Sequence, residues 1–521
     1  YTTNRVGNEV STDLNSTNET AGDRRIYLEA MVDYNRTFGR HDVNAMLLYN
    51  QDELVNNVPG NNLINSLPKR KQGLAGRLSY AYDGKYMAEV NMGYNGSENF
   101  AKGHRWGFFP SIALGYNISE ESFFEPLRKV ITSMKLRGSW GLVGNDQIGG
   151  ERFIYMPTIN LSGKGFTTGI DQNYGLSGPV YTRYENNSIT WEVGEKINLG
   201  IDLQLLNSLN IVVDIFRETR RDIFQKKGTI PTYLGTGNTD VFGNLAEMKN
   251  QGLDLSIDYN KAFSKDFYMN FKGTFTYAHN EITKYDEAPK YAFQSKVGQS
   301  ANVSQGYLSN GLFLDEAEID RYNQQMGSTL GAGDIKYLNV SNMHGYGDDI
   351  VDVDDWTWIG NPTVPEIVYG FGPSFKYKNW DFSFFFQGVA KTSLFMSGFH
   401  PFGDNSLRNV LQFVANDRWS PTNQNVDAKY PRLTRKTSLN NTNPGNSGRT
   451  SDYWMRDGSF LKLKNMELGY TFKRMRFYIS GSNLLTFSKF DLWDPEQGGG
   501  SGLKYPTQRV FNVGFQMTFN N

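Results

Sequence analysis

Residues 511–519 read Phe511-Asn512-Val513-Gly514-Phe515-Gln516-Met517-Thr518-Phe519, with apolar and polar positions in alternation. Successive side chains of a β-strand point to opposite faces, so this stretch predicts a strand with one apolar and one polar face. Residues 253–260 alternate in the same way, with the apolar set Leu253, Leu255, Ile257 and Tyr259. When most strands of a long chain alternate, we expect an all-β, antiparallel transmembrane barrel with lipid outside and water inside.

The alternation continues along nearly the whole chain and predicts about sixteen strands. Fifteen of them can be placed, at residues 25–37, 41–53, 71–83, 86–97, 106–118, 131–143, 197–205, 210–215, 253–260, 267–277, 367–378, 380–391, 453–472, 475–487 and 508–519. Some connections are short turns, whereas others run for tens of residues, at 54–70, 144–190, 218–247, 284–362 and 392–452. Short turns at one rim and long extracellular loops at the other are typical of an outer-membrane barrel.

Composition agrees with this interpretation. The chain of 521 residues has no cysteine, a mean hydropathy of −0.53 and no apolar run of the roughly eighteen residues that a transmembrane helix needs. Thirty tyrosines, 35 phenylalanines and nine tryptophans predict aromatic girdles at the two membrane interfaces. The formal net charge of −1 gives no support for nucleic-acid binding, which would need a basic stripe.

Soluble antiparallel sheets also alternate, but a soluble chain of this length would usually divide into domains of about 100–200 residues. Here the pattern runs on without a linker, and we prefer the membrane barrel. The chain is divided into a polar N-terminal segment, 1–24, and a barrel portion, 25–521. The first segment lacks the pattern of a signal peptide, and we expect it to be a loop or strand remnant within a longer protein.

Several short motifs add to the pattern. In chain order they are Asn95-Gly96-Ser97, Arg105-Trp106-Gly107-Phe108-Phe109-Pro110-Ser111, Met134-Lys135-Leu136-Arg137-Gly138-Ser139-Trp140-Gly141, Ile359-Gly360-Asn361-Pro362, Leu468-Gly469-Tyr470-Thr471-Phe472, Gly481-Ser482-Asn483-Leu484-Leu485 and Trp493-Asp494-Pro495-Glu496. This ordered series resembles the SusC-like (RagA-like) TonB-dependent transporters of Bacteroidota outer membranes. The resemblance extends from about residue 80 to the C-terminus.

The resemblance implies a barrel of twenty-two strands, about sixteen of them in this chain; the family's plug domain and TonB box have no counterpart here. It implies TonB-dependent active import across the outer membrane of a glycan oligosaccharide or, less often, a peptide. A SusD-like surface lipoprotein would cap the extracellular loops, and TonB-ExbB-ExbD would act through the plug. Pairs of transporter and lipoprotein would dimerise. One departure from the family is that Phe519, the terminal aromatic residue, is followed by Asn520 and Asn521.

The residues leave two other functions open. A passive porin or specific diffusion channel, complete as it stands, would also have about sixteen strands. An outer-membrane hydrolase would need catalytic Ser and His side chains in adjacent strands at the lipid face, and the sequence offers no such pair. The five histidines have no metal-ligand spacing. We therefore expect a transport protein, not an enzyme, with no cofactor beyond a possible structural Ca²⁺.

Loop aromatic residues are the candidates for ligand contact, because apolar faces of sugar rings pack on aromatic rings while amides and carboxylates hold hydroxyls. The loops contain Tyr174, Tyr181, Tyr184, Tyr233, Trp356, Trp358, Phe399 and Trp419. From these we single out Tyr174, Tyr233, Trp356, Trp358 and Phe399. The alternative is that the rings pack against other loops or the lipoprotein. Four cations are expected to face the lumen and to pair with carboxylates of the plug: Lys135, Arg137, Lys272 and Lys462.

The acidic stretch 344–355 is a candidate Ca²⁺ loop, with Asp348, Asp352 and Asp355 as ligands, since hard cations favour carboxylate oxygens. Many transporters of the family that this chain resembles carry a calcium-type Asp-x-Asn-Gly-Asp-Gly stretch at this point. This chain instead has His344, Gly345 and Tyr346 where the first ligands would lie. A solvated acidic loop is the alternative.

Overall fold

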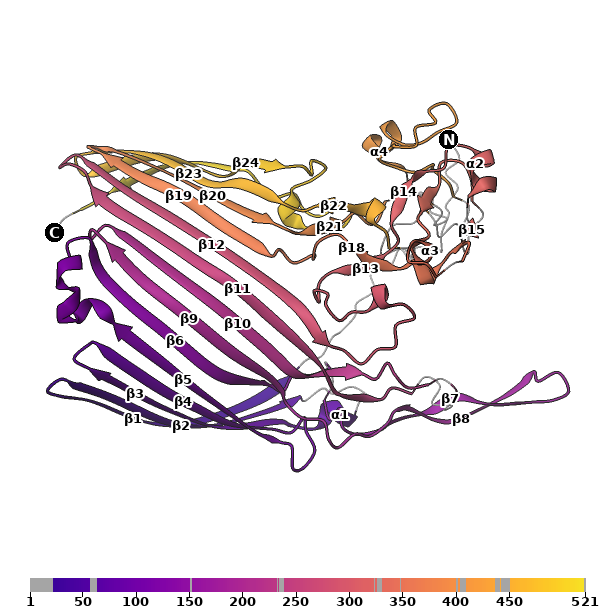
Figure 1. Ribbon diagram of the computed structural model, residues 1–521, viewed down its shortest axis with the longest axis horizontal. Coiled ribbons are helices and arrows are strands. Elements are labelled where there is room, and N and C mark those ends of the chain that lie inside the picture. The colour runs from indigo at the N-terminus through magenta and orange to yellow at the C-terminus, as the bar shows by residue number, and fades with distance from the viewer. Residues whose placement is uncertain are drawn as a thin grey trace.

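The computed structural model describes residues 22–56, 63–149, 152–231, 233, 239–322, 324–325, 330–346, 348–399, 402, 409–435, 441 and 450–519. Fifteen strands of this part form one sheet whose spatial order follows the chain, each strand pairing antiparallel with the next (Figure 1). They are β1 Asp23–Phe38, β2 His41–Asn56, β3 Lys69–Tyr82, β4 Tyr86–Ser97, β5 Trp106–Asn117, β6 Ile131–Asn145, β9 Glu192–Leu205, β10 Leu209–Lys226, β11 Phe242–Ala262, β12 Phe267–Lys284, β19 Ile367–Tyr377, β20 Trp380–Ala390, β23 Phe460–Phe472, β24 Met475–Ser488 and β25 Val510–Met517. The prediction of an antiparallel barrel portion with about sixteen strands is confirmed.

The strand boundaries differ from the predictions mainly at the long-loop end. β10 and β11 extend so far that the expected loop 218–247 shrinks to residues 227–241. Both faces of a strand meet water beyond the membrane, so the alternation that marks a strand disappears there although the hydrogen bonds continue. For the same reason the expected loop 144–190 conceals a second ribbon, β7 Thr158–Thr168 with β8 Tyr174–Arg183.

Short and long connections lie at opposite ends of the sheet (Figure 1). The short end holds tight turns and the two 3-10 turns η1 Ile118–Glu120 and η2 Ser122–Leu127. In one of these turns Asp83 and Gly84 both have positive φ, 54° and 67°, which is the geometry that a two-residue hairpin turn requires. Among the described residues, no helix is long and apolar enough to cross a membrane.

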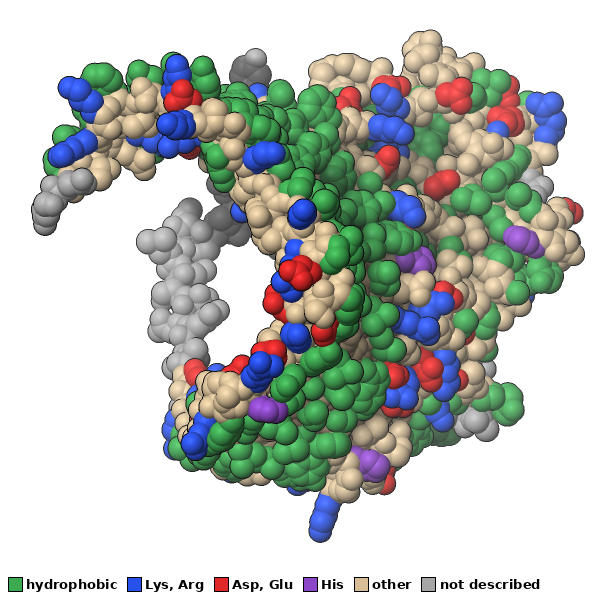
Figure 2. Space-filling model, turned by 60° about the vertical axis from the view of Figure 1, so that its left-hand side comes forward, with side chains coloured by type: hydrophobic (Ala, Val, Ile, Leu, Met, Phe, Trp, Pro, Cys, Tyr) green, Lys and Arg blue, Asp and Glu red, His purple; other side chains and the backbone are tan. Residues whose placement is uncertain are grey.

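The outer face of the sheet is apolar, and charged side chains lie along the hollow that the curved wall surrounds (Figure 2). Near the short-turn rim, ring-bearing residues are direct neighbours on successive strands. One row is Phe38, His41, Tyr82, Tyr86 and Tyr116, and a second row is Phe267, Tyr377, Trp380, Tyr470, Phe477 and Phe515. Such rows have the form of the aromatic girdle that anchors a barrel at the membrane interface.

At the other end, the described parts of two long connections fold together into what we call the loop body, within residues 285–366 and 391–459. Its short elements are η4 Ala292–Gln294, β13 Ser304–Gly306, β14 Ser309–Leu312, α2 Glu316–Arg321, β15 Gln324–Gln325, β16 Ile335–Tyr337, α3 Val340–Met343, β17 Ile350–Val351, η5 Val353–Asp355, β18 Thr357–Ile359, β21 Ser393–Phe395, α4 Gln412–Asn416, η6 Asp452–Trp454 and β22 Met455–Asp457. Helix α1 Leu63–Ser66 lies in another loop. The loop body has its own apolar core around Trp454, Tyr307 and Tyr337, which Phe490 joins from the β24–β25 connection.

Candidate functional site at the mouth of the barrel

The inner face of the wall is polar and hollowed. Direct cross-strand neighbours from β2 to β9 form one row on this face, namely Asn44, Ser79, Glu89, Ala113, Ser139 and Asn198. This row lines a groove of about 490 Å³. The groove is therefore the water-facing counterpart of the apolar outer face.

Arginine side chains tie non-adjacent strands together across glycines. Arg137 of β6 lies beside Gly200 of β9, and its Nη2 donates to Asp202 at 2.8 Å and to Asp214 of β10 at 2.9 Å. A Cβ atom at Gly200 would lie 2.6 Å from Asp214 Oδ1 and 2.8 Å from Arg137 Cζ. Gly200 thus leaves room for the guanidinium to pass over its Cα, and a larger residue would make the two side chains shift.

The same arrangement recurs near the C-terminus. Arg476 of β24 passes over Gly469 of β23 to reach Asp381 of β20, and its Nη2 also donates to Glu467 at 2.5 Å. A Cβ atom at Gly469 would lie 2.5 Å from Asp381 Oδ2 and 2.6 Å from Arg476 Nη2. In two separate parts of the wall, an arginine therefore passes over a glycine of the next strand and pairs with an aspartate of the strand beyond it.

Three of the four cations expected to face the lumen have carboxylate neighbours within the chain itself, and pairing with carboxylates of a plug stays a prediction. Arg137 pairs with two carboxylates of the wall, Lys272 lies 4.0 Å from Asp258 on the neighbouring strand, and Lys462 pairs with two carboxylates of a loop. Charges on adjacent strands can satisfy each other without a second domain.

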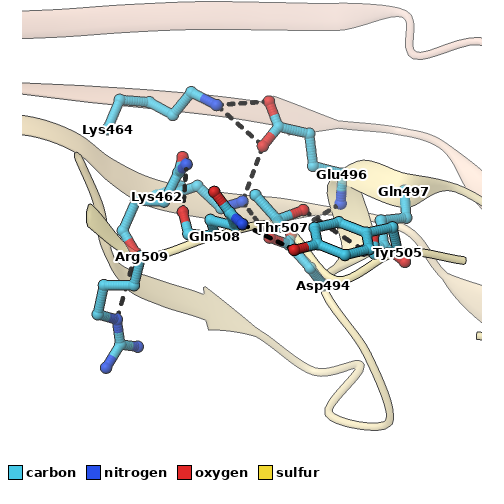
Figure 3. A network of polar contacts seen from close by, with 10 residues as sticks. Lys462, Lys464, Asp494, Glu496, Gln497, Tyr505, Thr507, Gln508 and Arg509 are labelled. Carbon is cyan, nitrogen blue, oxygen red and sulfur yellow. Dashed lines mark hydrogen bonds and ion pairs between the residues drawn. The ribbon is translucent and has the colours of Figure 1, made fainter.

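Lys462 of β23 is the centre of a polar network at the barrel mouth (Figure 3). Its side chain is 0% exposed, and Nζ lies 2.5 Å from Asp494 Oδ2 and 2.8 Å from Glu496 Oε2. Lys464 Nζ lies 2.6 Å from Glu496 Oε1. Lys462 and Lys464 are two positions apart on the strand and therefore share a face, so both can reach Glu496. The network holds η7, Pro495–Gln497, against the wall.

The contact with the lysines changes the pKa values of the Asp494 and Glu496 carboxyls. Partial burial is the largest single influence and tends to raise the pKa of both. The hydrogen bonds and charge attraction from Lys462, joined at Asp494 by the Glu496 N–H and at Glu496 by Lys464, together outweigh burial. The pKa of Asp494 and the pKa of Glu496 therefore lie below their ordinary values. A buried ammonium needs such partners, because an unpaired charge in this position would cost several kcal/mol; at neutral pH the network is a closed clamp.

A groove of about 650 Å³ lies between this clamp, the wall strands and the loop body. Its apolar lining is Pro365, Val389, Leu394, Phe395, Phe460 and Pro495. Its polar lining is Thr363, Gln387, Thr392, Ser393 and Ser397, and Glu496 and Gly498–Gly500 line it as well. Glu496 is already paired with the two lysines. The groove therefore offers apolar patches and neutral hydrogen-bonding groups, as sites for small neutral ligands do.

The structure does not gather the predicted ligand-contact residues into one site. Tyr174 is exposed on β8, and Tyr233 is exposed in the β10–β11 connection. Trp356 meets Tyr307 edge-on at 6.0 Å, and Trp358 Nε1 donates to the Ser295 carbonyl at 2.9 Å. Phe399 is buried in the core of the loop body, where a ligand would not reach it.

Other aromatic residues of the loops also have local partners. Tyr181 and Tyr184 stack on each other at 5.5 Å at the base of the β7–β8 ribbon. Trp419 is buried in the loop-body core, as Phe399 is. The loop–loop packing considered as the alternative thus accounts for several of these rings, and ligand contact at Tyr174, Tyr233, Trp356 and Trp358 stays a prediction.

The acidic loop uses its carboxylates locally. Asp355 is fully buried and accepts hydrogen bonds from the Ser341 and Asp352 N–H groups, at 2.9 and 2.7 Å. Asp352 caps η5 through the Asp354 N–H, and Asp348 accepts from the Ile350 N–H at 3.2 Å. Burial raises the pKa of Asp355. Within the described residues no three His, Cys, Asp or Glu side chains are grouped to hold a metal, and Ca²⁺ binding by this loop stays a prediction.

The clamp is the feature that sequence reasoning missed. Asp494 and Glu496 were visible in a family-like motif, and Lys462 was expected to face the lumen. Their pairing joins residues more than thirty positions apart, and no periodic pattern encodes that contact.

Comparison with known proteins agrees with this architecture. A family model described as "TonB dependent receptor-like, beta-barrel" matches residues 1–484. TonB-dependent receptor P3 of Formosa agariphila is 26% identical over 481 residues, covering 85% of this chain and 45% of that protein. TonB-dependent receptor SusC of Bacteroides thetaiotaomicron is 28% identical over 471 residues, covering 85% of this chain and 43% of that protein. The chain spans about half the length of the curated relatives it matches.

Among solved structures, the RagAB peptide transporter matches with a TM-score of 0.69 at 20% identity, covering 95% of this chain and 56% of its own. This likeness is one of fold. With its fifteen-stranded antiparallel wall, apolar outer face and match over residues 1–484, the chain belongs to the TonB-dependent receptor β-barrel family, whose named members include SusC.

Proposed function

We propose that this chain is the barrel part of a transporter that imports a glycan oligosaccharide across the bacterial outer membrane in a TonB-dependent manner. The observation that carries the proposal is the neutral groove between the clamp and the loop body, in a barrel of the TonB-dependent receptor family. A ligand held by many contacts leaves slowly, and energy input is then needed to release it inward.

The chemistry of the groove favours an oligosaccharide over a peptide. Val389 and Phe395 offer apolar surface to the faces of sugar rings, while Thr363, Gln387 and Ser397 can bond to hydroxyls. A peptide terminus would need an unpaired charge of opposite sign, and Glu496 in this groove is already neutralised by Lys462 and Lys464. Peptide remains the second candidate ligand, because the RagAB fold match is a peptide transporter.

The proposal includes partners. We place the plug and the contact with TonB-ExbB-ExbD in the part of the protein outside this chain. A SusD-like lipoprotein would cover the loop body, and the transporter–lipoprotein pairs would form dimers. The β7–β8 ribbon supports a protein partner, because two strands alone are marginally stable in water and Leu161, Phe166 and Ile170 are exposed on it (Figure 1).

Uptake of labelled hexasaccharides tests the function. Cells that express the full-length transporter and its lipoprotein should take up at least one of maltohexaose, cellohexaose, xylohexaose and mannohexaose, and a protonophore should abolish that uptake. Uptake that survives the protonophore would support a passive channel instead. Uptake of mixed hexapeptides but of none of the glycans would contradict glycan import and indicate a peptide importer.

A further inference from the structure

Four rings of the loop body lie against one another away from its core, three of them stacked and the fourth, Tyr346, tilted by 32° against Tyr291. Phe293 lies 4.6 Å from His344 with an interplanar angle of 14°, and 5.5 Å from Tyr291 with an angle of 13°. Tyr291 in turn lies 4.2 Å from Tyr346. The four rings come from two segments, one beside η4 and one just after α3, and we call them the ring stack.

The ring stack is at the surface. His344 and Tyr346 are exposed, and none of the four residues belongs to either of the buried clusters found in the described part of the chain. Exposing several rings together is unfavourable unless a partner covers them. His344 and Tyr346 at the ends of the stack are therefore its most accessible rings.

Polar groups border the rings. Lys290 pairs with Asp354 and lies over the Tyr291 ring at 5.2 Å. Gln294 Nε2 donates to the Asp354 and Val353 carbonyls at 3.0 and 3.3 Å, which fixes the segment that carries Tyr291 and Phe293 against η5. The ring stack is thus held in place and has an ammonium and a carboxylate beside it.

We propose that the ring stack is a binding subsite for a pyranose ring of an oligosaccharide, an inference that rests on the proposed function. A pyranose has an apolar C–H face and a rim of hydroxyls, so it can continue a stack of flat rings while its hydroxyls meet Lys290 and Asp354. A protein partner would instead need a wider apolar surface, including exposed Met343 of α3. His344 and Tyr346 occupy the positions where the first Ca²⁺ ligands of the resembled family would lie. In this proposal they supply the aromatic rings on which the sugar packs.

Isothermal titration of the full-length transporter, with the four hexasaccharides as probes, tests this subsite. Tyr346→Ala should weaken binding of the recognised hexasaccharide about threefold to tenfold, as the loss of one ring contact implies. His344→Ala should weaken it by a similar factor. Tyr346→Phe keeps the ring, and Met343→Ala removes a neighbouring exposed apolar side chain; both should bind within about twofold of the original protein.

Unchanged affinity of both alanine variants would overturn the subsite while leaving glycan import intact. If Met343→Ala and Tyr346→Ala instead weakened capture of the lipoprotein equally, without affecting hexasaccharide binding, the patch would be a protein contact and the proposal would be wrong. Binding of none of the hexasaccharides to the unaltered transporter would overturn both the subsite and the proposed glycan function.

Discussion

Arg137 and Asp214 lie two strands apart, yet Arg137 Nη2 reaches Asp214 Oδ2 at 2.9 Å by passing over Gly200 of the strand between them. Hydrogen bonds of the backbone join only adjacent strands. A side chain that spans three strands therefore adds a second kind of link, and Arg476 repeats it at Gly469.

Gly200→Ala should weaken the wall, because the added Cβ would sit 2.6 Å from Asp214 Oδ1 and force the guanidinium aside. We expect a loss of about 1–3 kcal/mol, the range for breaking such a charged network. A folded barrel and an unfolded one migrate differently in a denaturing gel. The heating temperature at which the sample changes to the unfolded migration should therefore be lower for the variant. Gly138→Ala is the matched control, since its Cβ would meet only Leu199 Cδ2 at an ordinary 3.4 Å; an equal fall there would contradict the assignment.

Lys462→Met should release the segment 494–507 from the wall. The side chain is fully buried, and its removal leaves Asp494 and Glu496 without their shared cation. Protease cleavage within 498–507 should become at least about tenfold faster, which corresponds to about 1.4 kcal/mol. Lys464→Met should have a smaller effect because Lys464 is more exposed and pairs with Glu496 only. If the segment stays equally resistant in the Lys462 variant, it is held by other contacts.

Acid should open the same clamp. The pKa values of Asp494 and Glu496 are lowered in the folded state, so their stabilising contribution is complete above the unfolded pKa of about 4 and is lost as pH falls through the folded values. Leu503→Cys introduces a cysteine into a chain that has none, and a fluorophore can be attached to it. The fluorophore should report a closed segment from pH 7 to about 5 and opening of the segment below about 4. Lys462→Met should remove that transition; an unchanged transition would exclude the clamp as its source.

Asp334→Ala should loosen the loop body without affecting the barrel. Asp334 is fully buried and accepts hydrogen bonds from Arg432 Nη2 at 3.0 Å and Asn441 Nδ2 at 2.6 Å, linking distant parts of the loop body. Its loss leaves Arg432 without its carboxylate partner, at a cost of about 3–5 kcal/mol. Limited proteolysis should cut the loop body, residues 285–366 and 391–459, faster while the gel mobility of the barrel is unchanged. Exposed Asp349→Ala serves as the control and should behave like the original protein.

The sequence predicts the wall well because a membrane barrel must place apolar and polar side chains on opposite faces of every strand. Wherever this requirement holds, as in residues 253–260 and 511–517, pattern and structure agree. Beyond the membrane both faces meet water, and the ends of β10 and β11 and the β7–β8 ribbon consequently escaped prediction.

The candidate site was less predictable. Phe399 and Trp356 are both aromatic loop residues, yet one is buried in the loop body and the other is at its surface, a difference set by packing between remote segments. The Lys462 clamp and the ring stack likewise join residues far apart in the chain. Such contacts depend on tertiary structure and leave no periodic trace in the sequence.

Spin labels on adjacent residues of β9 give the most direct test of which solvent each face meets. In the transporter reconstituted into liposomes, a label on Leu199→Cys should be relaxed mainly by oxygen, which concentrates in hydrocarbon. A label on Asn198→Cys should be relaxed mainly by a water-soluble nickel chelate. We expect this opposite preference at the two neighbouring positions; equal accessibility, or the reverse preference, would contradict a sheet with lipid on one side and water on the other.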